Sequence, residues 1–323
     1  MKSADQPIPL SEVADDAADL IRAFRANGAI SFQDVTLAQS RTNYLASCKT
    51  NGLPAEEVGS VAAHGYPVDG ATASIRLYRP RGVEADDVLP LIVFIHGGGW
   101  VLGSLDTHDT LCRHICNATG FALAAIDYRL APEHKFPVPL NDCRQALQWL
   151  AGNAEALRTD VTRVVLVGDS AGGSLATVLA NEASQHLDTA RILGQVLLYP
   201  VTDLSRETPS YQLVKSGFPL TASSMRWFGN HYVPAGLDLA DPRLSPLLTA
   251  ERKQPPLFIV TVGHDPLSDE GIAYAGAAAR AGTQVEHHHL PRHAHGLFTS
   301  AGKIQTGREL LQLASNFVVG TLS

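Results

Sequence analysis

A serine near the middle of the chain lies in a context that could make its hydroxyl a nucleophile. Residues 168–172 read Gly-Asp-Ser-Ala-Gly, so Ser170 stands between two glycines. An apolar stretch precedes the pentapeptide and a helical pattern follows it, which is typical of a tight strand-to-helix turn that exposes a nucleophilic serine. Side chains in place of the glycines would collide with neighbouring backbone. We expect Ser170 to attack an acyl carbonyl; the alternative is a glycine-rich turn that only begins a helix.

A run of three glycines could stabilise the oxyanion that such an attack creates. The segment His96-Gly97-Gly98-Gly99-Trp100 follows directly after an apolar stretch. Oxyanions are stabilised by backbone N–H groups that already point at them, and glycines let the backbone approach closely. We predict that these donors are the N–H groups of Gly98, Gly99 and Ala171. His96 is expected to hold the loop through hydrogen bonds; the alternative for the whole segment is an ordinary flexible turn.

A serine hydroxyl needs a base to take its proton, and the base needs an acid that orients it. The acid is predicted to be Asp265, because it comes just past an apolar stretch at 257–262. Asp269 and Glu270 are close rivals, but both read as residues of the first turn of the next helix, where acids are common.

The base is predicted to be His295, which lies in a loop after the last apolar stretch, with His293 as the alternative. Three consecutive histidines at 287–289 fall within that stretch, where alternation would point His287 and His289 to one face and His288 to the other. No additional ligands in a defined geometry accompany them, so we expect no metal site.

The composition indicates a globular protein and disfavours several function classes. Of the 323 residues 45% are hydrophobic and 18% are charged. The formal net charge of −7 disfavours nucleic acid as a partner, since nothing could neutralise a run of phosphates. No apolar run approaches the length of a membrane span, and the first residues lack the pattern of a secretion signal. We therefore expect a cytoplasmic protein that does not bind membranes, with its four cysteines reduced.

Short apolar stretches alternate with helical patterns along most of the chain. After a half-exposed strand at 74–79, apolar stretches lie at 91–95, 121–126, 164–167, 195–199, 257–262 and 284–290. Helical patterns lie at 142–150, 173–185 and 269–281. This alternation predicts an α/β fold with a mostly parallel central sheet that helices cover on both faces.

Two stretches do not fit the alternation. The first fifty residues contain helical patterns, at 12–27 and 41–48, upstream of the first strand. Residues 203–250 form a connection longer than one crossover needs. Since open α/β sheets bind ligands at the carboxyl ends of their strands, both stretches are candidates for a cap there. The predicted division is cap at 1–50, core at 51–202, cap insertion at 203–250 and core at 251–323, in one catalytic domain.

Together these motifs resemble the hormone-sensitive-lipase-like family of α/β-hydrolases, the bacterial family IV esterases. The resemblance runs from about Arg79 to Phe298 and includes the segment Asp127-Tyr128-Arg129-Leu130-Ala131-Pro132-Glu133-His134. It implies that Asp265 and His295 complete a triad with Ser170, that the segment at 127–134 braces the oxyanion loops, and that helices form a cap. It also implies hydrolysis of short and medium acyl esters without a cofactor, and dimers in many members.

The expected reaction is hydrolysis of a small ester by a serine carboxylesterase through an acyl-enzyme. An amidase or formamidase on the same triad is one alternative, since amides need the same residues. A binding protein on an inactive hydrolase scaffold is the other. Six residues lie in segments that should face the substrate: Trp100, Phe218, Trp227, Phe228, Leu267 and Leu297.

Overall fold

A single mixed β-sheet forms the centre of the protein. The computed structural model describes residues 6–186 and 190–323, and within them eight strands pair in the order β1-β2-β4-β3-β5-β6-β7-β8. The strands are β1 Ser60–Val68, β2 Ala71–Arg79, β3 Leu89–Ile95, β4 Ala122–Asp127, β5 Thr159–Asp169, β6 Ile192–Leu198, β7 Leu257–His264 and β8 Val285–Ala294. Strands β1 and β2 pair antiparallel to their neighbours, and all pairs from β4 to β8 are parallel. The predicted α/β fold with a mostly parallel sheet is confirmed.

The central strands are apolar on both faces because both faces are covered. All seven residues of β3 are buried. Its alternate residues belong to two separate cores: Leu91, Val93 and Ile95 pack on one side of the sheet, and Ile92 and Phe94 on the other. A strand buried in this way reads as a continuous apolar run, which is why the sequence predicted it well.

Strand β1 was missed by the sequence analysis. It lies at the edge of the sheet, and most of its nine residues are exposed, with Tyr66 and Val68 the buried ones. An edge strand that buries so little lacks the apolar run by which the other strands were recognised.

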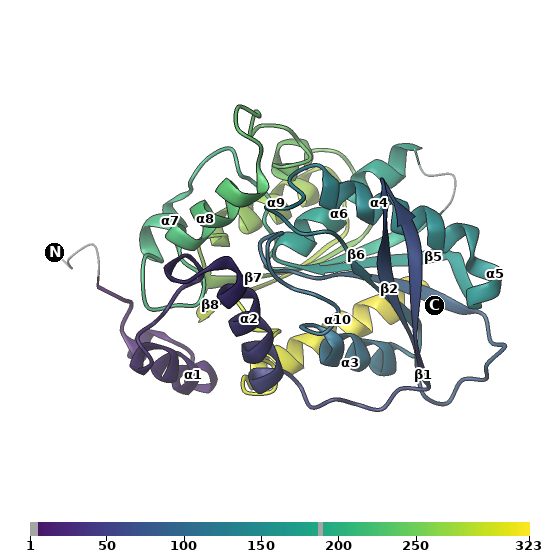
Figure 1. The fold of residues 1–323 in the computed structure, drawn as a ribbon, viewed down its shortest axis with the longest axis horizontal. Helices are drawn as coiled ribbons and strands as arrows, with labels where there is room; N and C mark the ends of the chain where they lie inside the picture. The colour runs from purple at the N-terminus through teal and green to yellow at the C-terminus, as the bar shows by residue number, and fades with distance from the viewer. Residues whose placement is uncertain (1–5, 187–189) are drawn as a thin grey trace.

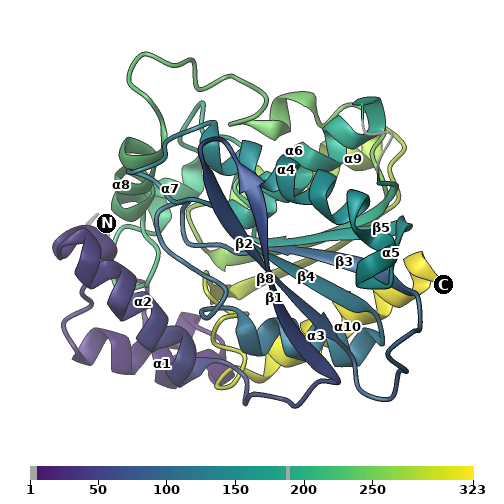
Figure 2. The ribbon, with the colours of Figure 1, turned by 45° about the vertical axis from the view of Figure 1, so that its right-hand side comes forward.

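Helices cover the sheet in two layers (Figure 1). On one face lie α3 and α10, and on the other lie α4, α6 and α9, an arrangement that Figure 2 shows from a second side. Their bounds are α3 Asp109–Thr119, α4 Val138–Gly152, α6 Ala171–His186, α9 Ser268–Arg280 and α10 Gln305–Leu322; a short helix, α5 Ala154–Leu157, leads into β5.

The two stretches that were predicted to form a cap lie beside each other. The N-terminal stretch contains α1 Asp15–Ala26 and α2 Leu37–Asn51, and the insertion contains α7 Pro209–Leu213 and α8 Ala222–Tyr232. Short 3-10 helices lie at Leu10–Glu12, Phe32–Asp34 and Pro246–Thr249. The rings of Phe32 and Phe228 approach to 5.3 Å, and Ser224 donates a hydrogen bond to Gln33 at 3.0 Å. Segments about 190 residues apart in sequence thus meet at one end of the sheet (Figure 1).

Candidate active site

Ser170 lies in a strained turn between β5 and α6. Its φ angle is +53°, a left-handed conformation that residues other than glycine rarely adopt. Its N–H donates to the carbonyl oxygen of Leu198 at 2.8 Å, which fixes the turn against β6. A Cβ on Gly168 would lie 2.4 Å from the backbone of Gly172, and a Cβ on Gly172 would lie 2.0 Å from the carbonyl oxygen of Ile95. Both glycines are therefore required by close backbone contacts, as predicted for a nucleophile turn.

His295 and Asp265 form a hydrogen-bonded pair at the carboxyl ends of β7 and β8. The Nδ1 atom of His295 lies 2.7 Å from Oδ2 of Asp265. The other carboxylate oxygen accepts the N–H of Leu267 at 2.9 Å, so buried Asp265 is held from two sides. The ring of Tyr199 packs on the imidazole with centroids 4.2 Å apart. Because Nδ1 is occupied, Nε2 is the imidazole nitrogen left to exchange a proton with another group.

The rival acids and the rival histidine have other partners. Asp269 accepts the N–H of Ser210 at 2.8 Å. Glu270 is fully buried and accepts the backbone N–H groups of Thr202 and Asp203, at 2.7 and 3.1 Å. His293 contacts Asp16. Asp265 is thus the acid that the structure places against His295.

Residues 96–100, which follow β3 and are called the glycine loop below, border a cavity that Ser170 and His295 also line. Gly98 and Gly99 have φ angles of +117° and +63°, and both line the cavity. Over the described part of the chain, neither of their N–H groups donates a hydrogen bond to the protein. Ala171 is buried at the start of α6, where backbone N–H groups also lack partners inside the helix. Free N–H groups at these positions are what an oxyanion site requires.

Buried polar groups brace that loop from behind. The N–H of Gly97 donates to Asp169 at 2.8 Å, and a Cβ at Gly97 would clash with the same carboxylate. Burial raises the pKa of Asp169, but His108, 3.1 Å away, and the Gly97 N–H outweigh it, so the pKa stays below its usual value. The Nδ1 atom of His96 lies 2.9 Å from the carbonyl oxygen of Gly97, and burial lowers the pKa of His96 to about 4. A neutral, buried His96 fits the structural role predicted for it.

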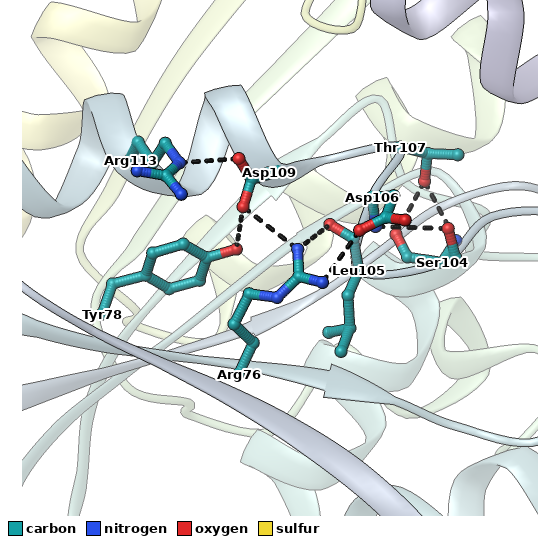
Figure 3. Close-up of polar contacts among 8 residues, drawn as sticks. All are labelled: Arg76, Tyr78, Ser104, Leu105, Asp106, Thr107, Asp109 and Arg113. Atoms are coloured by element: carbon teal, nitrogen blue, oxygen red, sulfur yellow. Dashed lines mark hydrogen bonds and ion pairs between the residues drawn. The ribbon is translucent and has the colours of Figure 1, made fainter. Parts of the chain in front are cut away.

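A polar network anchors the segment that follows the loop (Figure 3). The side chains of Arg76 and Tyr78 on β2 and of Arg113 on α3 converge on the carboxylate of Asp109, at 3.1, 2.8 and 2.6 Å. Burial raises the pKa of Asp109, but these partners lower it more, so the pKa is below its usual value. Since Asp109 directly follows His108, the network fixes the residue that stands beside Asp169.

The segment at 127–134 also contacts the glycine loop, as the family resemblance implied. The hydroxyl of Tyr128 donates to the carbonyl oxygen of His96 at 2.8 Å. The N–H of Ala131 donates to the carbonyl oxygen of Trp100 at 2.9 Å. Arg41, on α2, forms two hydrogen bonds with Glu133 at 2.8 and 2.7 Å, and Arg41 holds the pKa of Glu133 down at about 2. The segment therefore connects the glycine loop to an N-terminal helix.

An apolar cavity of about 270 Å³ opens onto Ser170, His295 and the glycine loop. About half of the residues that line it come from the N-terminal stretch, and the apolar ones among them are Ala17, Leu20, Ile21, Phe24, Ile30, Phe32, Val35, Tyr44 and Cys48. The sequence predicted that this stretch would contribute to a cap over the carboxyl ends of the strands, but it did not show which of its side chains would line a cavity. These wall residues were missed for that reason.

Of the six residues predicted to face the substrate, Phe228 lines the cavity and the others do not. Trp100 stacks on Tyr232 with centroids 4.2 Å apart, and Trp227 packs against Phe228 and His231. The remaining three are buried among other side chains, with Phe218 between His264 and Arg25, and Leu267 and Leu297 in the two cores. These five predictions are corrected. Trp100, Leu267 and Leu297 follow site motifs in sequence, but their side chains are buried in the packing around the site. Phe218 and Trp227 belong to the insertion, and their side chains contact neighbours outside the cavity lining.

The three consecutive histidines alternate across β8 as predicted. His287 and His289 both contact the hydroxyl of Thr261, at 2.8 and 2.9 Å, and His288 contacts Glu286 at 2.9 Å. Among the residues that the structure describes, no group of three or more His, Cys, Asp or Glu side chains is arranged to hold a metal ion.

No helix in the described ranges is long and apolar enough to cross a membrane.

Comparison with known proteins shows the family. Residues 92–299 match the family described as alpha/beta hydrolase fold. The chain belongs to the α/β-hydrolase family. This hydrolase is 41% identical to the ethyl acetate hydrolase of Pseudomonas putida over 243 residues, which cover 75% of this chain and 76% of the relative. It is 39% identical to the carboxylic ester hydrolase LipN of Mycobacterium tuberculosis, over 89% of this chain and 74% of the relative.

Solved structures agree with the sequence relatives. An alpha/beta hydrolase enzyme from the metagenome of Lake Arreo superimposes with a TM-score of 0.90 at 34% identity, over 96% of this hydrolase and 98% of that chain. The esterase of Pyrobaculum calidifontis gives a TM-score of 0.83 at 30% identity, over 98% of this chain and 100% of its own. Both comparisons extend over almost the whole chain, including the N-terminal stretch.

Proposed function

We propose that this carboxylic ester hydrolase acts through Ser170, His295 and Asp265 and forms an acyl-enzyme. The observation that carries the proposal is the hydrogen bond of 2.7 Å between His295 and Asp265 at a cavity that Ser170 also lines. Gly98 and Gly99 border the same cavity, and their N–H groups donate to no group in the part of the chain that the structure describes. Nucleophile, oriented base and oxyanion donors are the groups that acyl transfer requires.

The proposed cycle moves one proton through His295. The imidazole takes the proton of the Ser170 hydroxyl while the oxygen attacks the ester carbonyl, and Gly98, Gly99 and Ala171 donate to the resulting oxyanion. His295 then gives the proton to the leaving alcohol, and the acyl group stays on Ser170. A water molecule attacks the acyl-enzyme with His295 again as base, the acid leaves, and Ser170 regains its proton. Asp265 remains ionised throughout and stabilises the imidazolium.

The cavity supports short to medium acyl esters as substrates. Its volume of about 270 Å³ is at the lower end of small-molecule sites, which typically span ~300–1,000 Å³. Its walls are mainly aliphatic and aromatic, so they favour an alkyl substituent over a charged one. We also propose that residues 1–50 and 203–250 together form the cap of this site, because both supply walls of the cavity.

The test is hydrolysis of p-nitrophenyl esters with acyl chains from acetyl to palmitoyl. Wild-type protein should cleave short and medium chains best, and Ser170→Ala should lose activity on all of them. Ser315→Ala is the matched control, because it removes another buried serine hydroxyl, on α10 and outside the cavity lining. In the part of the chain that the structure describes, this hydroxyl donates to the carbonyl oxygen of Leu311 in its own helix. Undiminished turnover by purified Ser170→Ala would remove Ser170 from the mechanism. A parallel series of p-nitroanilides separates esterase from amidase activity.

A further inference from the structure

One carboxylate on α1 joins three segments of the protein. Oδ1 of Asp16 lies 3.0 Å from Nε2 of His293, at the end of β8. Oδ2 accepts both the N–H of Thr306 at 2.9 Å and its hydroxyl at 2.8 Å, at the start of α10. Burial raises the pKa of Asp16, but the bonds from Thr306 and His293 lower it more, so the carboxylate is ionised at neutral pH. Hydrogen bonds to a charged acceptor are the stronger kind.

Each of the three segments supplies a wall of the substrate cavity. Ala17, the residue after Asp16, lines it. So does His295, two residues after His293, and so does Ile304, two residues before Thr306. Asp16 therefore holds together, from outside the cavity, three wall segments that are far apart in sequence.

Helix α1 depends on such contacts for its position. It has only 12 residues, and its N-cap residue, Ala14, has no side chain that could cap it. Helices of this length are marginal in water without tertiary contacts. Arg292 adds contacts just before the helix: its guanidinium donates to the carbonyl oxygen of Val13 at 2.7 Å, and its own carbonyl oxygen accepts the N–H of Ala14 at 2.9 Å. Asp16 is the point within the helix itself that is tied to both β8 and α10.

The other acids of α1 are arranged differently. The side chain of Asp15 is 97% exposed and lies 3.3 Å from Arg292. The side chain of Asp19 is 92% exposed and pairs with Arg22 of the same helix. The side chain of Asp16, by contrast, is 27% exposed and its partner His293 only 10%. Asp19 therefore offers the same residue type on the same helix without the cross-links.

We propose that Asp16 is a positioning residue that fixes α1 against the end of β8 and the loop that carries His295. In this way it sets the width of the substrate cavity. This inference rests on the proposed function, because it assigns the cavity to the ester. Leu20, Ile21 and Phe24 lie one to two turns further along the helix and form part of the apolar wall. When the tie through Asp16 is lost, these side chains move away from the cavity and the preference among chain lengths is relaxed.

The experiment compares wild type, Asp16→Asn and Asp19→Asn in two substrate series. One series varies the acyl group of p-nitrophenyl esters from acetyl to decanoyl, and the other varies the alcohol of acetate esters from ethyl to octyl. The values of kcat and KM are determined separately, and thermal unfolding is followed for each variant. Discrimination by one methylene in an apolar pocket is about 10- to 200-fold, so a loosened wall should reduce the preference by about fivefold or more.

The expected result is that Asp16→Asn keeps its activity on the smallest esters and loses chain-length preference through KM, whereas Asp19→Asn matches wild type. Thr306→Val removes only the hydroxyl donor, should act in the same direction with a smaller effect, and decides the question if Asp16→Asn does not fold. A folded Asp16→Asn protein with an unchanged preference would overturn the proposal. So would a fall in kcat that is equal for all esters. A wild-type protein that cleaves no ester contradicts the proposed function instead.

Discussion

The turns proposed to carry the catalytic groups and the walls of the cavity are held in place by different kinds of contact. Ser170 and Gly98 lie on turns with positive φ angles that are packed closely against backbone. An added Cβ at Gly168, Gly172 or Gly98 would collide with main-chain atoms at 2.0 to 2.4 Å. The walls on α1 and α2 are held instead by side-chain pairs, Asp16 with His293 and Arg41 with Glu133. Few substitutions are compatible with the backbone packing of the turns, whereas the side chains of a wall contact can be substituted without disturbing the sheet.

This difference implies that the chemistry and the substrate preference can vary separately. A change in the turns should affect the rate with every ester, because the oxyanion and the proton transfer are common to all of them. A change in a wall contact should affect substrates according to their shape.

The largest effect is expected where His295 loses its orienting acid. Asp265→Asn keeps the shape of the side chain, but its amide can favour the wrong tautomer of the imidazole, and such a change lowers kcat by about 10,000-fold in serine hydrolases. The loss should be the same for acetyl and decanoyl esters, measured as kcat at saturating substrate. A loss that differs strongly between the two would mean that Asp265 shapes the cavity as well.

A smaller loss is expected from Gly99→Ala, at the point where the two regions meet. A Cβ on Gly99 would lie 2.2 Å from the ring of Phe228, which belongs to α8. The glycine loop should shift away, and removal of one oxyanion donor typically lowers kcat by about 100- to 1,000-fold. The double variant Gly99→Ala/Phe228→Ala removes the clash and should recover part of the rate. Equal rates in the single and the double variant would show that the positive φ angle, rather than the clash, is responsible.

A third effect concerns stability and comes from Glu270 on α9. Its carboxyl group accepts the N–H groups of Thr202 and Asp203, where the chain leaves the sheet and enters the insertion. Burial raises the pKa of Glu270 well above its usual 4.5, although the N–H groups of Thr202 and Asp203 lower it. The folded protein therefore keeps a proton that the unfolded chain releases above pH 4.5. The free energy of unfolding should fall with rising pH by about 1.4 kcal/mol per pH unit, up to the folded-state pKa.

Glu270→Gln keeps the side-chain oxygen but removes this titration. Urea unfolding of both proteins between pH 5 and pH 9 measures the difference, which should grow in favour of the variant as the pH rises. Parallel pH profiles for the two proteins would show that Glu270 is ionised in the folded state.

The smallest effect is expected at the pair between Arg41 and Glu133. Both side chains are partly exposed, at 32% and 51%, so solvent screens the pair and its contribution to stability should be about 1 kcal/mol or less. A double-mutant cycle of Arg41→Met and Glu133→Gln, followed by thermal unfolding at low and high salt, measures that coupling. Part of the effect of Arg41→Met alone should persist in high salt, because Arg41 also donates to the carbonyl oxygens of Val101 and Ala131. A coupling that salt does not reduce would contradict the screened-pair interpretation.

The structure brings together the residues that the sequence predicted for catalysis, whereas most walls of the cavity were not predicted. Strand-turn-helix order and required glycines are local signals, so Ser170 and the glycine loop could be found without a structure. Asp265 and His295 followed from their positions after successive strands. The partners of Asp16 lie some 280 residues away, and no local pattern predicts such a contact. Trp100, Leu267 and Leu297 lie outside the cavity lining because proximity to a motif does not determine where a side chain points. Phe218 and Trp227 were predicted from their place in the insertion, which does not determine which side chains face inward.

Covalent labelling tests most directly whether Ser170 is the nucleophile of this ester hydrolase. The protein is treated with an alkyl p-nitrophenyl phosphonate, which transfers its phosphonyl group to an activated serine, and the adduct is located by peptide mass spectrometry. We predict one adduct per chain on the peptide that contains Ser170, loss of ester hydrolysis in proportion to labelling, and protection by a competing ester. An adduct on a different residue, or full activity after Ser170 is labelled, would contradict the assignment.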